Sequence, residues 1–165
     1  MKEVVIQLNR AEVVYDLQFA TNRIARLVSL DKDGKQTKIN SSISAEGKDN
    51  DDYVNRLITS AVSELRSNTA WANAEKSGSV VDNNLSEKIG RWVFVFKVPM
   101  SWRGNTQVLG DKIHEYVSNK VTAGWLKMVA PGYTQTYREE ADSALNDIKH
   151  ELRKDDPEKT EFTQL

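Results

Sequence analysis

Residues 91–102, RWVFVFKVPMSW, form the most apolar stretch of a 165-residue chain. Successive side chains of a strand point to opposite faces. This alternation places Trp92, Phe94, Phe96 and Val98 on one face and Val93 and Val95 on the other. Pro99 ends the predicted strand, because proline cannot donate to a ladder of backbone hydrogen bonds. Both faces are apolar and need a cover, although the chain offers only one other strand pattern, near residues 3–8.

Helices account for most of the remaining sequence. Apolar residues recur at spacings of three and four, the pattern of an amphipathic helix. The predicted helices cover about 11–29, 51–71, 106–130 and 133–154. We therefore expect a mainly α fold: a four-helix bundle-like domain over residues 1–154, with a small β element formed by strands near 3–8 and 91–98, and a polar C-terminal tail over 155–165.

The segment at 30–49 is polar and contains Gly34 and Gly47, with Ile39 and Ile43 as its apolar anchors. A connection of this length inside a compact domain is uncommon, and such loops are often functional or disordered. A surface loop, a weak hairpin and a mobile arm all remain compatible with this composition.

Composition sets limits on function. Lys and Arg number 23 and Asp and Glu 24, so the whole molecule carries no field that would draw it to nucleic acid or to an anionic membrane. The absence of cysteine excludes disulfides, thiolate metal sites and a cysteine nucleophile. No apolar run approaches a membrane span, which predicts a protein of the cytoplasm of a bacterium or of a virus-infected cell.

Motifs that carry chemistry are missing or incomplete. After His114, the second histidine of a zinc-binding HExxH motif is replaced by Ser118. The DKDG stretch from Asp31 begins like a calcium loop, but Ser42 stands where the bidentate glutamate is needed. We therefore predict no enzyme activity, no catalytic or metal-binding residues and no cofactor. Carboxylates are plentiful, and an enzyme that uses a pair of them stays the least favoured alternative.

A locally basic surface is the main argument for nucleic-acid binding. The first predicted helix and the following loop carry Arg10, Arg23, Arg26, Lys32, Lys35 and Lys38. Such groups can follow a phosphate backbone. Acidic residues interrupt the series, so a mixed, solvated surface is the better explanation.

The region from about 49 to 153 resembles the small helical head-to-tail connector, or neck, proteins of tailed bacteriophages and prophages. The resemblance rests on the stretch DNDDYVNRLITSAVSEL and on LGDKIHEYVSNKVTAGWLKMVAPGYTQTYREEADSALNDIKHEL. The matching positions are Ile58, Ala61, Trp125, Tyr137, Ala144, Leu145, Ile148 and Leu152. The N-terminal strand, the 30–49 loop and the strand at 91–98 depart from that family's usual pattern.

This resemblance implies a structural component of the virion neck, assembled in the bacterial cytoplasm as a homo-oligomeric ring between the portal and the tail or neck proteins, without membrane contact. Neighbouring copies would then cover the strand at 91–98. The expected interface residues are Trp92, Phe94, Phe96, Trp102 and Trp125. Lys32, Lys35 and Lys38 would contact the portal or DNA in the channel. The alternative is a small cytosolic helical protein that binds a protein or nucleic-acid partner in a regulatory role.

Overall fold

The computed structural model describes residues 1–30, 34–35, 43–45, 47, 50–73 and 89–155. Its strands are β1 (Lys2–Asn9) and β2 (Arg91–Val98). Its helices are α1 (Arg10–Val28), α2 (Asp51–Asn68), α3 (Thr106–Val129) and α4 (Thr134–Arg153), with short 3-10 turns at Ala70–Ala72 and Pro131–Tyr133. The expected mainly α fold with a small β element is confirmed.

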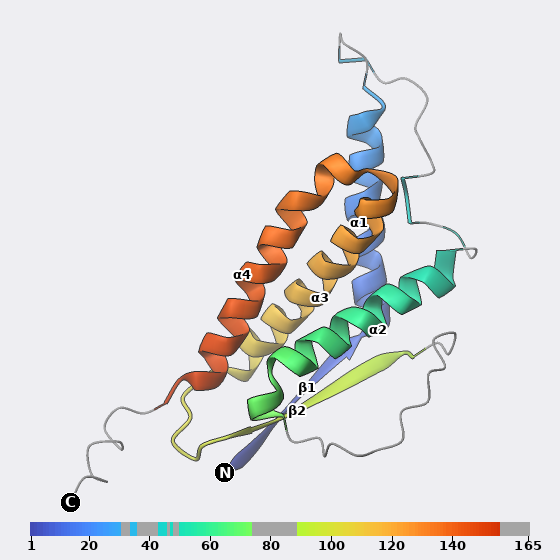
Figure 1. Cartoon of the computed structure of the whole chain (residues 1–165). Coiled ribbons are helices and arrows are strands. Elements are labelled where there is room, and N and C mark those ends of the chain that lie inside the picture. Colours follow the sequence, from blue (N-terminus) through green and yellow to red (C-terminus); the bar gives the residue numbers. More distant parts are fainter. Residues whose placement is uncertain (31–33, 36–42, 46, 48–49, 74–88, 156–165) are drawn as a thin grey trace, which may run out of the picture.

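Helix α3 is the centre of the arrangement. It packs antiparallel against α4 and also contacts α1, α2 and β1 (Figure 1). The side chain of Asn105 accepts hydrogen bonds from the backbone N–H groups of Gln107 and Val108, at 2.8 and 3.2 Å, and so caps its first turn. Pro131 follows its last turn, where a further helical turn would lack a donor.

The two strands pair antiparallel in a register that joins Lys2 to Val98 and Asn9 to Arg91. One face of this sheet is buried and contributes Val4, Ile6, Leu8, Trp92, Phe94, Phe96 and Val98 to the core. The other face carries Glu3, Val5, Gln7 and Asn9 from β1, all exposed. A two-stranded sheet is marginal alone, so its stability here comes from the helices packed on the buried face.

Part of the predicted 30–49 loop is anchored to the helices. Ile43 and Ala45 are buried. The indole Nε1–H of Trp125 donates to the carbonyl of Ile43 at 2.7 Å, and the N–H of Ala45 donates to Thr21 Oγ1 at 3.1 Å. Ile39 lies outside the described residues, as does the predicted tail beyond Asp155.

The start of β1 and the end of α4 lie at the same end of the molecule (Figure 1). Lys2 Nζ donates to the carbonyl of Trp102 at 3.2 Å, and the N–H of Arg103 donates to the carbonyl of Lys154 at 3.1 Å. The turn after β2 therefore joins the sheet to the end of the helical hairpin.

Candidate interaction surface

The aromatic residues expected at a subunit interface are buried in the chain's own core. Exposure is between 1% and 6% for Trp92, Phe94, Phe96, Trp102 and Trp125. The structure therefore contradicts the expectation that these side chains contact another subunit. The expectation failed because helices of the same chain bury one face of the sheet, with α3 against β1 and Arg66 of α2 over the ring of Phe94. Strand alternation alone does not reveal such a cover.

Hydrogen bonds fix two of these aromatic side chains inside the core. The Nε1–H of Trp102 donates to the carbonyl of Glu151 at 2.9 Å. Trp125 donates to the carbonyl of Ile43, as described above. Burying an indole N–H without an acceptor is costly, and here both acceptors belong to the same chain.

The outer face of the sheet keeps apolar atoms in contact with solvent. Val5 is 56% exposed and Val93 is 38% exposed. Val5 pairs directly with Val95, so the three valines lie close together on this face. The outer face, and not the aromatic face, is thus the part of the 91–98 strand that the chain leaves uncovered.

The free edge of β2 is occupied by the chain itself. Arg66 Nη2 donates to the carbonyl of Val93 at 3.0 Å. Asn73 forms an antiparallel bridge with Phe96. A strand from another molecule would have to displace both groups to pair with this edge.

The free edge of β1 has no such cover. The N–H of Arg10 donates to the carbonyl of Gly90 at 3.0 Å and extends the register by one hydrogen-bonded pair. Hydrogen-bonded and non-hydrogen-bonded pairs alternate along an antiparallel ladder. Counting back from Arg10, the non-hydrogen-bonded residues of β1 are Glu3, Val5, Gln7 and Asn9, whose backbone N–H and C=O groups point away from β2. The carbonyl of Asn9, the residue before α1, accepts the first hydrogen bond of that helix. In the part of the chain that the structure describes, no hydrogen bond outside the helices and the β1–β2 ladder reaches the outward groups of Glu3, Val5 and Gln7. An open edge of this kind is a template for another strand.

A groove of about 750 Å³ runs along this open edge. One wall is formed by residues 5–9 of β1. The other wall comes from the start of α1 and the first turns of α3: Glu12, Thr106, Gln107, Gly110, Asp111 and His114. Gly110 leaves room between α3 and β1. A Cβ at this position would lie 3.7 Å from Cγ2 of Ile6, and a larger side chain would fill this part of the groove.

The charges that line the groove are acidic. Glu12 and Asp111 are both exposed, and Gln107 Nε2 donates to Asp111 Oδ1 at 2.9 Å. The lining includes no lysine or arginine among the described residues, and its one histidine is held by another carboxylate. The groove therefore presents negative charge beside a row of unpaired backbone groups.

The histidine belongs to a polar contact between α1 and α3. His114 Nε2 lies 2.6 Å from Asp16 Oδ2, and Ser118 Oγ lies 3.4 Å from the same nitrogen. A Ser-His-Asp relay needs the carboxylate and the hydroxyl on different ring nitrogens. Because both groups share Nε2, the cluster links two helices and is not arranged as a relay.

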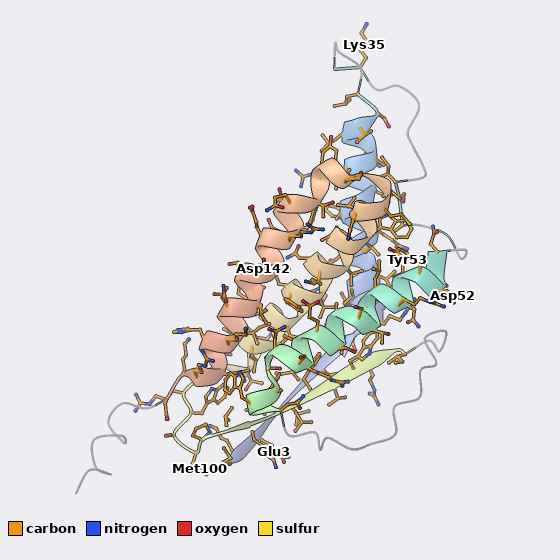
Figure 2. The ribbon with its side chains drawn as sticks, viewed as in Figure 1. Glu3, Lys35, Asp52, Tyr53, Met100 and Asp142 are labelled. Carbon is orange, nitrogen blue, oxygen red and sulfur yellow. The ribbon has the colours of Figure 1, made fainter. Side chains whose placement is uncertain are left out.

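Of the three lysines predicted to contact a portal or DNA, the structure describes Lys35. Lys35 is exposed at the opposite end of the molecule from Glu3 and Met100 (Figure 2). Lys32 and Lys38 lie outside the described residues. The structure therefore does not bring Lys35 together with the open strand edge.

Sequence patterns did not identify the groove residues. Val5, Glu12, Gly110 and Asp111 come from segments about one hundred positions apart in the chain, and no spacing within one segment reports that they meet. The one pattern in the sequence that pointed to this surface is the alternation of polar and apolar residues in β1, which indicates a strand with one solvated face.

Comparisons with known proteins give no relative: neither a family model, nor a curated protein, nor a solved structure matches the chain. Across the described ranges, no three acidic or histidine side chains converge closely enough to hold a metal ion. In the same residues, no helix is long and apolar enough to cross a lipid bilayer.

Proposed function

We propose that the chain is a structural adaptor of the neck of a tailed phage or prophage, located in the virion between portal and tail as a ring of identical copies. The observation that carries this proposal is the open edge of β1 beside the groove, because unpaired backbone groups in a formed groove suit the binding of another polypeptide. The assembly itself is suggested by the sequence resemblance over residues 49–153.

The residues behind the resemblance are packing positions in the structure. Ile58, Ala61, Trp125, Ala144, Ile148 and Leu152 are buried, and Tyr137 and Leu145 pack against the core. They hold α2, α3 and α4 together and leave the groove and the outer sheet face for contacts with other proteins. A stiff helical body with an accessible strand edge supports an adaptor role.

The sheet edges limit how copies in such a ring can meet. A continuous sheet around a ring would pair β1 of one copy with the outer edge of β2 of the next. Arg66 and Asn73 occupy that edge. Copies would therefore meet through other surfaces, and β1 would remain available to a different component of the neck.

The test combines the mass of the isolated protein with binding to a portal. We expect light scattering to show one defined oligomer, with a mass that is a whole-number multiple of the monomer mass. This oligomer should form either at millimolar protein or after addition of the portal protein encoded by the same phage genome. A monomer under both conditions, with metabolic genes beside its own gene, would refute the proposal.

A second candidate function is supported by the outer face of α1. Tyr15 and Phe19 are exposed there, and Arg23 and Arg26 line a small cavity beside Phe19. Aromatic and arginine side chains together are favoured at contacts with proteins and single-stranded nucleic acid. Salt-dependent binding of a DNA oligonucleotide, lost in Arg23→Gln with Arg26→Gln, would favour this regulatory role over the adaptor.

A further inference from the structure

We infer that the groove receives an extended segment of another protein, which adds to β1 as a third strand and carries lysine or arginine side chains toward Glu12 and Asp111. The inference rests on the proposed function, since it names the kind of segment that the adaptor binds. It concerns the neighbouring component of the neck, not the contact between copies.

The backbone of β1 sets the length of this segment. The outward groups are the N–H and C=O of Glu3, Val5 and Gln7 and the N–H of Asn9, a run of six residue steps. At about 3.3 Å per residue this edge is roughly 20 Å long, which matches about seven residues of extended chain. A helix could not use these groups, because its own backbone donors and acceptors are already paired.

The walls of the groove set the chemistry of the side chains. Residues of the segment that face α3 meet Gln107, Gly110 and Asp111. Residues that face outward lie beside Val5, whose side chain is more than half exposed. Alternation of basic and β-branched apolar residues satisfies both faces.

The same charges disfavour two other occupants. Nucleic acid would bring phosphates against Glu12 and Asp111. A second copy pairing through its own β1 would bring two acidic grooves together, along with Glu3 of each strand. Like charges across paired strands are destabilising, so a basic segment is the better partner.

The first experiment uses two synthetic peptides with the full-length protein. One eight-residue peptide alternates valine and lysine, and the control alternates valine and glutamate. We expect the lysine peptide to slow hydrogen exchange at the amides of Val5 and Gln7 and to leave Ile6, which already donates to β2, unchanged. Equal binding of the glutamate peptide, or protection that excludes Val5 and Gln7, would overturn the inference.

Charge reversal tests the role of the carboxylates. Glu12→Lys combined with Asp111→Lys should weaken binding of the lysine peptide about tenfold, because exposed ion pairs are weak and the variant replaces two of them by like charges. The same double variant should bind the glutamate peptide more tightly than the original chain does. Unchanged affinities for both peptides would show that these carboxylates do not face the segment.

Val5→Pro tests the backbone contact. Proline removes one outward N–H and is tolerated on an edge strand, while the bonds of Val4 and Ile6 to β2 are kept. We expect an unchanged near-ultraviolet circular dichroism spectrum and at least a tenfold loss of peptide binding. The matched control, Val5→Thr, keeps the N–H and should bind like the original chain. A Val5→Pro protein that is folded and still binds would refute strand addition.

Two outcomes separate this inference from the proposed function. Protection of Val5 and Gln7 that grows with protein concentration in the absence of peptide would mean that a second copy occupies the groove, and would overturn the basic-segment inference alone. Ring formation or portal binding that persists in Val5→Pro, together with failure of the lysine peptide to bind the unaltered chain, would leave the adaptor proposal standing and the inference refuted.

Discussion

At the scale of single residues, two glycines on either side of the α3 cap have opposite surroundings. A Cβ at Gly110 would lie 3.7 Å from Ile6 Cγ2, an ordinary contact. A Cβ at Gly104 would lie 2.1 Å from the ring of Trp102, which its hydrogen bond to the carbonyl of Glu151 holds in place. One position therefore has room for a methyl group and the other does not.

We predict that Gly110→Ala raises the free energy of unfolding by about 0.5–1 kcal/mol, because alanine loses less backbone freedom in a helix. Gly104→Ala should lower it by about 1–3 kcal/mol, because the ring must move in a packed region. Urea unfolding of the two variants measures both effects. A neutral Gly104→Ala would mean that the Trp102 ring is free to shift.

At the scale of elements, a buried carboxylate joins the end of α4 to the start of α3. Glu151 is almost fully buried. Its Oε1 accepts from the N–H of Asn105 at 2.5 Å, and its Oε2 lies 2.6 Å from Lys154 Nζ. Burial acts to raise the pKa of Glu151, but the hydrogen bonds from Lys154 and Asn105 outweigh it and hold this pKa below its ordinary value of 4.5.

This lowered pKa gives stability a defined pH dependence. The contribution of Glu151 is fully present above pH 4.5 and is lost as the pH falls through the folded-state pKa. Glu151→Gln should cost about 1–3 kcal/mol at neutral pH, since it removes a charged hydrogen-bonding partner. The difference from the original chain should shrink in acid.

Urea unfolding at neutral pH and at several values below 4.5 measures this difference. Glu140→Gln, on the exposed side of α4, is the matched control and should change little at any pH. A gap between Glu151→Gln and the original chain that stays constant into acid would show that the carboxylate is not the source of the stability.

Element positions were largely predictable from sequence. Regular spacing of apolar residues predicts each helix. In the structure Asn105 caps the first turn of α3 and Pro131 follows its last turn, close to the predicted ends at 106 and 130. Strand alternation correctly predicts two apolar faces for β2. It could not predict that helices bury one of them, because that depends on packing between segments distant in the chain.

At the scale of the whole molecule, the buried sheet face is part of one continuous core. Phe94 and Phe96 stack with ring centroids 6.2 Å apart inside that core, whereas Val93 lies on the solvated face. The sheet therefore contributes to the stability of a single chain, because its aromatic face is buried without a partner.

We predict that Phe94→Ala lowers the free energy of unfolding by about 3–5 kcal/mol. Val93→Thr should change it by no more than about 0.5 kcal/mol. Measuring the free energy of unfolding of both variants at several protein concentrations shows whether Phe94 stabilises the single chain or a contact between copies. A cost of Phe94→Ala that appears only in concentrated protein would restore the view that another copy covers this face.

The candidate site is a product of the whole fold and was beyond prediction from the sequence. Residues 5–9 form a groove with α3 only because the register of the sheet sets β1 against the first turns of that helix. The aromatic residues first expected at an interface are large and apolar, which makes them equally suitable for a core. Only packing distinguishes the two uses.

The pairing of the first strand with one that begins at Arg91 also has a consequence during synthesis. β1 leaves the ribosome while its partner is still untranslated, and more than eighty residues must follow before the ladder can close. At typical translation rates this delay is about 5–20 s. Nascent chains therefore expose an unpaired strand with one apolar face to solvent for that time, and a product truncated before Arg91 never acquires its partner.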